Sequence, residues 1–149
     1  MCGTRIPVLL MISNSGEDHA RNLHKQKWES FSDHLIRAGY TANSDFALSV
    51  GKEYEVYAMS LWCGVIMLLL AAEHHLPNWF PMELLSLSDS RVPADWSFLP
   101  CLANENGLQA LWGYERLITD ASHYDDLIER GPTALRHFYE EECLRRRCD

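Results

Sequence analysis

The sequence predicts a single α+β domain over residues 1–149, built on a central antiparallel β-sheet of four to six strands. One amphipathic helix is expected before the sheet and two or three helices after it. Near-helical apolar spacing before residue 40, strand-like alternation from residue 53 and helix-start signals after residue 120 predict this order. A chain of 149 residues fits one domain. It buries roughly 68–70% of its unfolded surface, so the core needs no metal or disulfide.

The first elements are a strand and a helix. Residues 6–12 form a short apolar run, which predicts a buried strand. Ser15 and Asp18 then form a Ser-x-x-Asp helix start, in which the Ser hydroxyl can cap a backbone amide. Gly39 is a typical helix stop. The apolar residues between these signals recur at near-helical spacing: Ala20, Leu23, Trp28, Phe31 and Leu35. We therefore expect an amphipathic helix over residues 16–38.

The middle of the chain alternates in the way a strand does. Tyr54, Val56, Ala58 and Ser60 fall on one face, and the residues between them fall on the other. A tight turn at residues 62–64 leads into the apolar run 65–72, which is typical of a strand covered on both faces. A helix over residues 57–73 is the alternative, but Gly64 and the Val, Ile and Tyr content favour a hairpin. Residues 45–50 predict a further short strand.

A region rich in Pro and Trp follows the hairpin. Residues 74–81 hold two prolines and no apolar period, which predicts a loop. Residues 82–88 predict a strand, or one turn of helix followed by a strand. Residues 89–94 predict a turn, and residues 96–99 a last short strand.

The last part of the chain predicts helices. Residues 108–111 and 114–118 are rich in apolar side chains and read as helical, with an interruption at Gly113. Ser122 opens another Ser-x-x-Asp start, and this helix should stop at Gly131. Pro132 suits the first position of the final helix. The apolar face of that helix should consist of Leu135, Phe138, Tyr139 and Cys143.

Charge and cysteine content restrict the function and the compartment. The chain carries 21 acids against 13 Lys and Arg, a net charge of −8. This charge disfavours nucleic acids and anionic membranes as partners, because both are bound through Lys and Arg. A basic protein would be attracted. Five cysteines without a Cys-x-x-Cys pair indicate free thiols in a reducing compartment. No apolar run reaches the ~20 residues of a membrane helix, so we expect a cytoplasmic protein.

The sequence contains no catalytic signature that we can assign. Walker, G-x-G-x-x-G and G-x-S-x-G motifs are absent. Glu73, His74 and His75 are adjacent, and neighbouring side chains on a strand point to opposite faces, so we predict no metal site. Cys101, in a loop after Pro100, is the one thiol in a setting compatible with nucleophilic chemistry. We predict a protein without enzymatic activity and without a cofactor.

Aromatic and charged side chains gather beside the predicted loops, and Trp and Arg are enriched at interface hot spots. Asp89 and Asp95 are the expected contacts for a basic partner. The alternative for Trp79 and Trp96 is a core plug that closes the end of the sheet, and this alternative carries more weight. With Trp112 on the same rim, the predicted partner-binding residues are Trp79, Phe80, Glu83, Asp89, Arg91, Asp95 and Trp96.

Four segments resemble a known class of proteins. They read LPNWFP at 76–81, VPADW at 92–96, WGYERL at 112–117 and SHYDDLIERGPTAL at 122–135. In style they are similar to the small cytoplasmic immunity proteins that bacteria encode beside polymorphic toxins. The resemblance implies a protein that binds one cognate toxin and blocks its active site. Many such toxins are basic nucleases, which suits an acidic inhibitor.

Two other functions stay open at the level of sequence. An acidic phage- or plasmid-encoded antagonist could mimic nucleic acid against a host nuclease or defence complex, although three consecutive arginines near the C-terminus disfavour an evenly acidic face. A small enzyme could use Cys101 or a histidine. The sequence predicts neither the identity of the partner nor the oligomeric state.

Overall fold

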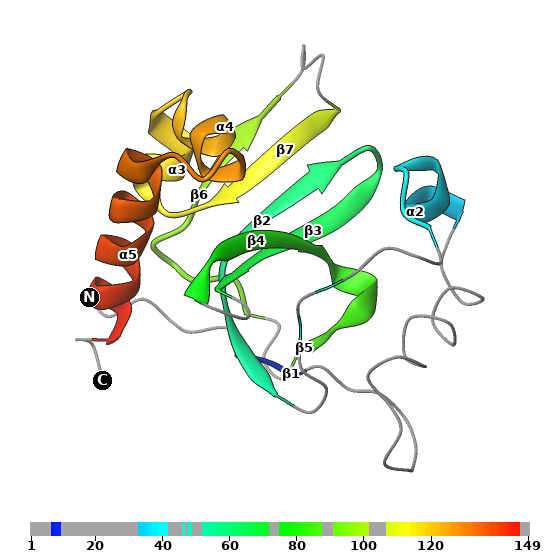
Figure 1. Cartoon of the computed structure of the whole chain (residues 1–149), viewed down its shortest axis with the longest axis horizontal. Coiled ribbons are helices and arrows are strands. Elements are labelled where there is room, and N and C mark those ends of the chain that lie inside the picture. Colours follow the sequence, from blue (N-terminus) through cyan, green and yellow to red (C-terminus); the bar gives the residue numbers. More distant parts are fainter. Residues whose placement is uncertain are drawn as a thin grey trace.

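The computed structural model has the predicted α+β class, with one antiparallel sheet and three helices after it (Figure 1). No helix among the described residues is long and apolar enough to cross a membrane. The structure describes residues 7–9, 33–41, 46, 48, 52–71, 75–87, 91–101 and 107–146.

The central hairpin is confirmed. Strand β2 (Glu53–Trp62) pairs antiparallel with β3 (Val65–Ala71), and Trp62 lies opposite Val65. The two turn residues both have left-handed backbones, Cys63 with φ 48° and Gly64 with φ 77°. Such a two-residue turn matches the twist of the strands it joins. Gly64 therefore lies in the turn between two strands and not in a helix.

The long strand β2 joins two groups of strands. Its first residues pair with β1 (Pro7–Leu9), which pairs in turn with β5 (Ser86–Leu87). Its last five residues pair with β7 (Leu108–Gly113), which pairs in turn with β6 (Ser97–Pro100). Five strands follow the order β4-β3-β2-β1-β5, and β6 and β7 extend the sheet to seven strands, one more than the four to six expected.

The sheet bends where β2 changes neighbours. The register between β2 and β3 shifts between Val56 and Ala58, and such a bulge bends a strand. In Figure 1, β6 and β7 lie at one end of β2 and β1 and β5 at the other. The short strands β5 and β6 therefore lie at edges of the sheet.

One predicted loop is a strand. Residues 77–81 belong to β4 (Pro77–Pro81), which pairs with β3, so the prediction of a loop over 74–81 is wrong there. The prolines are tolerated because they are the first and last residues of a strand at the end of the sheet. The single helical turn Met82–Leu84 (η2) and β5 then follow, as expected for residues 82–88.

A predicted helix is also a strand. Residues 108–111 lie in β7, between β2 and β6. Leu108, Ala110 and Leu111 are buried and Gln109 between them is exposed, and periodicity cannot separate so short an apolar-rich run from a helix. A Cβ on Gly113 would lie 2.8 Å from the Cβ of Ala58. This glycine therefore marks a close approach of two strands.

The N-terminal predictions are tested only in part. Strand β1 lies within the apolar run 6–12. Of the helix expected over 16–38, residues 33–38 are described: α2 (Asp33–Arg37) is helical and Ala38 already lies in the turn after it, whereas residues 16–32 fall outside the described residues. The predicted stop at Gly39 is confirmed by its left-handed φ of 99°. Of the strand expected over 45–50, Phe46 and Leu48 are described, and neither lies in a strand.

Three C-terminal helices cover one face of the sheet: α3 (Glu115–Thr119), α4 (His123–Ile128) and α5 (Pro132–Arg146). Their core includes Phe138, packed against Tyr57 with ring centroids 4.9 Å apart. Pro132 is the first residue of α5, as predicted. A second core cluster contains Val56, Leu68 and Phe80. Because strand side chains alternate between faces, β2 and β3 contribute to both clusters.

The end of α4 differs by one residue from the predicted stop at Gly131. The Gly131 N–H donates to the Asp126 carbonyl at 2.8 Å, and the Arg130 N–H donates to the Leu127 carbonyl at 3.1 Å. These two bonds form a Schellman motif. The left-handed residue in it is Arg130, with φ 57°, where glycine is the usual residue.

Arg130→Gly is expected to raise the free energy of unfolding by about 0.5–1 kcal/mol, because the left-handed backbone strains an L-residue more than the entropy of glycine costs. Urea denaturation measures the change. Arg130→Ala, which keeps the strain, should show no such gain, and an equal gain in both variants would contradict the argument.

Candidate protein-binding surface

Strand β6 is exposed along its whole length. Phe98 is 53% exposed and Leu99 37%, and Val92, in the segment leading into the strand, is 57% exposed. Phe98 and Leu99 are neighbours on a strand and point to opposite faces, so Phe98 is the large exposed side chain of its own face. Exposed aromatic side chains of this kind are frequent anchors of interfaces. This stretch of chain is therefore our candidate site.

The exposed Phe98 is supported from beneath. Its ring stacks on Trp112 of β7, with centroids 4.9 Å apart and a tilt of 31°. Trp112 is half-buried and lies opposite Met59 of β2, which packs against the second core cluster. Trp96 packs against the same cluster. We call Trp96, Phe98 and Trp112 the aromatic ledge, an extension of the core onto the surface.

The main chain of β6 offers little to an added strand. The Cys101 N–H donates to the Gln109 carbonyl at 2.9 Å. Since hydrogen-bonded pairs alternate in an antiparallel ladder, Leu99 bonds β7, whereas Phe98 and Pro100 direct their backbone groups away from it. Pro100 has no N–H to donate there, and the Trp96 N–H already donates to Pro93. Proline at such an edge blocks strand pairing, so the ledge must act through its side chains.

Three of the predicted partner-binding residues lie elsewhere. Trp79 and Phe80 belong to β4, and Glu83 belongs to η2, beyond β3 and β2 as seen from β7 and β6. Phe80 is 2% exposed and is a core residue. Trp79 is half-buried and stacks on Tyr124 at 5.6 Å, and Glu83 is exposed. The structure does not bring these three residues to the ledge.

Three of the other predicted residues, Arg91, Asp95 and Trp96, lie in the segment that precedes β6. Arg91 and Asp95 are exposed, Trp96 is half-buried, and Asp89 falls outside the described residues. Trp96 and Trp79 both pack against core clusters, as the core-plug alternative states. Sequence reasoning missed Phe98 as a site residue. Its position in a predicted strand gave no sign of which face it occupies.

One acidic side chain lies next to the ledge in the chain. Ser97 of β6 lies opposite Gly113 of β7, so the residues before β6 and after β7 lie at the same end of the two strands. Asp95 is exposed there and precedes Trp96 of the ledge. Glu115 is exposed at the same end, but it begins α3, which covers the other face of the sheet. Arg91 adds one cation to the segment, so the strong negative charge belongs to the chain as a whole.

A polar pocket of about 390 Å³ lies between α3 and α5. Tyr114, Arg116, Asp120, His137 and Glu140 are among its lining residues. The Tyr114 hydroxyl lies 2.7 Å from Nε2 of the buried His123, and the His123 and His137 rings are 6.0 Å apart. These three aromatic groups link the end of β7 to α4 and α5.

The environment of His123 sets its charge. Burial lowers the pKa of His123, the positive charge of His137 lowers it further, and Asp120 opposes the shift. The pKa of Asp120 is itself lowered, first by its hydrogen bond from the Ser122 hydroxyl at 3.0 Å. Ser122 thus precedes α4 as predicted but bonds Asp120 and does not cap the helix.

We expect stability to fall as the pH drops below about 6.5. Because the folded pKa of His123 is below the ordinary value of 6.5, the unfolded chain binds the proton first, and the loss grows until the folded pKa is passed. Urea midpoints measured between pH 7.5 and 5 test this prediction. His123→Gln should flatten the pH dependence, whereas His75→Gln, at an exposed histidine, should not. Equal slopes in all three proteins would assign the effect to another group.

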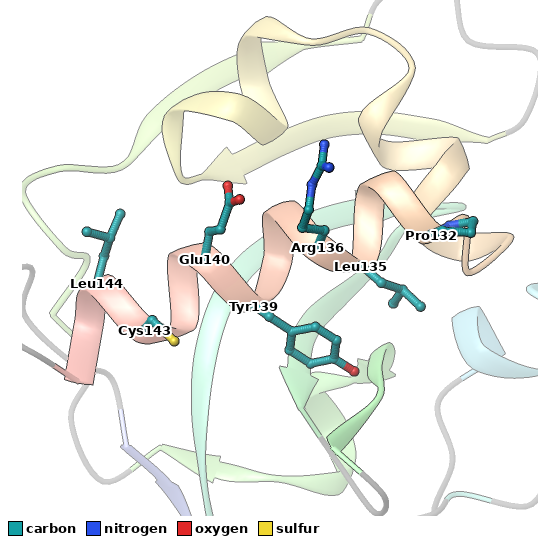
Figure 2. A pocket seen from close by; sticks show the side chains of 7 residues that line it. All are labelled: Pro132, Leu135, Arg136, Tyr139, Glu140, Cys143 and Leu144. Carbon is teal, nitrogen blue, oxygen red and sulfur yellow. The ribbon is translucent and has the colours of Figure 1, made fainter.

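A groove of about 750 Å³ runs along the outside of α5 (Figure 2). Of the predicted apolar face, Phe138 is buried in the core, Leu135 and Tyr139 are half-buried, and Cys143 is exposed. Leu135 and Tyr139 lie on one side of the helix in Figure 2, and Glu140 on the other. The Tyr139 hydroxyl donates to the His75 carbonyl at 3.0 Å. This bond ties α5 to the segment before β4.

Among the described residues, no group of three or more His, Cys, Asp or Glu side chains could hold a metal ion. Burial raises the pKa of the Cys101 thiol, which lowers the fraction of reactive thiolate. Its Sγ lies 3.8 Å from the Leu99 carbonyl. This environment does not activate the thiol.

No protein-family model, curated protein or solved structure matches the chain. A function for it must be argued from its own surface and charge.

Proposed function

We propose that this chain is a non-enzymatic, protein-binding inhibitor that neutralises a basic toxin, as immunity proteins do. The observation that carries the proposal is the solvent-exposed Phe98 stacked on Trp112 along an exposed strand. Large aromatic side chains on a rigid support are the usual anchors of an interface. The net charge of −8 selects a basic partner.

The charge acts mainly on the rate of association. An acidic protein attracts a basic partner over a distance of about one Debye length, ~8 Å at physiological salt, and raising the salt screens this attraction. The aromatic ledge supplies the short-range contact that slows dissociation. Binding that weakens with salt through a slower on-rate, with a nearly constant off-rate, is the expected signature.

The partner can be isolated from the native host. The tagged chain is expressed there and purified at low salt, and a co-purifying chain is identified by mass spectrometry and produced separately. Its Kd is then measured. A one-to-one complex that blocks the partner's own activity supports the proposal. Displacement of the partner by duplex DNA would favour the nucleic-acid mimic.

Phe98→Asp is expected to weaken the complex at least tenfold, because it removes the exposed ring and places a charge that loses water on binding. Isothermal titration measures the Kd. Ile128→Asp is the matched control, since Ile128 is 54% exposed on α4 and the charge change is the same. Equal losses in the two variants, or no loss in Phe98→Asp, would place the interface elsewhere.

The polar pocket favours a second candidate, a small enzyme. It is lined by Tyr114, whose hydroxyl bonds the buried His123 behind it, and by the half-buried His137 of α5. Because Tyr114 and His123 are themselves buried, His137 is the group placed to exchange a proton with a bound molecule. His137→Ala separates the candidates: an inhibitor keeps its partner affinity, whereas an enzyme loses its phenotype in the host.

A further inference from the structure

The surroundings of the Phe98 ring in the aromatic ledge favour one class of ligand. We propose that the ledge takes an arginine side chain of a folded basic partner, laid over the exposed face of Phe98. This inference rests on the proposed function and names the chemistry of the contact at the same site. It follows from the ring geometry, the exposed Asp95 next to Trp96, the negative charge of the chain and the blocked main chain of β6.

The Phe98 ring has one face covered and substantial area open. Trp112 stacks against one side at 4.9 Å, yet half of the residue remains exposed. The face of an aromatic ring is negatively polarised and attracts a cation within about 6 Å of the centroid. Trp112 beneath fixes the ring position, so little side-chain freedom is lost when a ligand binds.

An exposed carboxylate favours arginine over other cations. Asp95 is exposed just before Trp96, at one end of β6. A guanidinium stacks flat on an aromatic ring while its N–H groups reach outward to a carboxylate, which the compact ammonium of lysine does less well.

Other occupants fit the surface less well. A second copy of this chain also carries a charge of −8, so two copies repel. An extended peptide added to the edge of β6 would find one outward N–H, that of Phe98, because Pro100 has no N–H and the Trp96 N–H is already bonded. A folded basic partner that presents a side chain avoids both obstacles.

The contact can be tested first with a probe, L-argininamide, followed through the Trp indole signals of the labelled protein by NMR. We expect millimolar binding that shifts the Trp112 indole, with weaker shifts from lysinamide and none from glycinamide. Phe98→Leu keeps apolar volume and removes the ring, and it should abolish the argininamide shift. Equal shifts from lysinamide and argininamide, or no selective shift at Trp112, would overturn the inference.

The same variants applied to the partner complex separate this inference from the proposed function. Phe98→Leu and Phe98→Asp should both weaken the complex, at least fivefold and tenfold, with unchanged thermal unfolding because Phe98 is exposed. If Phe98→Asp weakens it and Phe98→Leu does not, the surface stands and the arginine contact is overturned. If neither variant weakens it, the proposed surface itself fails.

Two further results would replace arginine with another occupant. Pro100→Thr restores an N–H at the edge of β6, and a tighter complex in this variant would indicate strand addition. Ultracentrifugation of the chain alone should show a monomer. A dimer that Phe98→Asp dissolves would assign the ledge to a second copy. An unchanged Pro100→Thr complex and a monomeric chain support the arginine contact.

Discussion

Phe138→Ala is expected to lower the free energy of unfolding by about 3–5 kcal/mol, the usual cost of truncating a buried aromatic ring. The Phe138 side chain has no exposed surface, and it joins α5 to Tyr57 of the sheet. Removing it leaves a cavity between the helix layer and the sheet. A loss this large would remove a substantial share of the 5–15 kcal/mol that stabilises an ordinary domain.

Urea denaturation followed by far-UV circular dichroism measures this loss. Leu144→Ala, on the same helix at a residue that is 58% exposed, should change stability by less than about 0.5 kcal/mol. Similar losses at the two positions would mean that Phe138 is not enclosed between the helices and the sheet.

Gly113→Val is the second large effect, with an expected cost of about 3 kcal/mol from overpacking. A Cβ at this position would lie 2.8 Å from the Cβ of Ala58 and 3.0 Å from Cδ2 of Leu117. Either β7 moves away from β2 or α3 lifts from the sheet. Because Trp112 is the preceding residue, the aromatic ledge should be disturbed together with the fold.

A matched control uses the same new side chain across the strand pair. Ser97 lies opposite Gly113 in β6 and is exposed, so Ser97→Val should leave stability within about 0.5 kcal/mol of the original chain. Denaturation midpoints compare the two variants. If Gly113→Val were as stable as Ser97→Val, the close approach of β7, β2 and α3 would not be a constraint.

The packing around Gly113 explains why the backbone that supports the aromatic ledge is rigid. Strand β7 is held by pairing on both sides, with β2 and with β6, and α3 packs on it at Gly113. Phe98 therefore stacks on a Trp whose backbone is fixed by neighbours. An interface built on such a support loses little entropy when a partner binds.

The sequence by itself determined the elements that local chemistry specifies. Gly64 in the turn predicted over 62–64 indicated the β2–β3 hairpin, Gly39 predicted the end of α2, and Pro132 predicted the start of α5. Each of these signals acts through the backbone of one or two residues. For that reason they operate before any distant contact forms, and the structure confirms all three.

Only the tertiary structure decided that β4 and β7 are strands and that Phe98 is exposed. Strand β7 became a strand because β2 and β6 lie on its two sides, and β4 because β3 offers it a ladder. Phe80 and Phe98 both lie in short strands flanked by proline, yet one is core and the other exposed. Burial depends on which distant elements cover a face of the sheet, and a local pattern of residues does not contain that information.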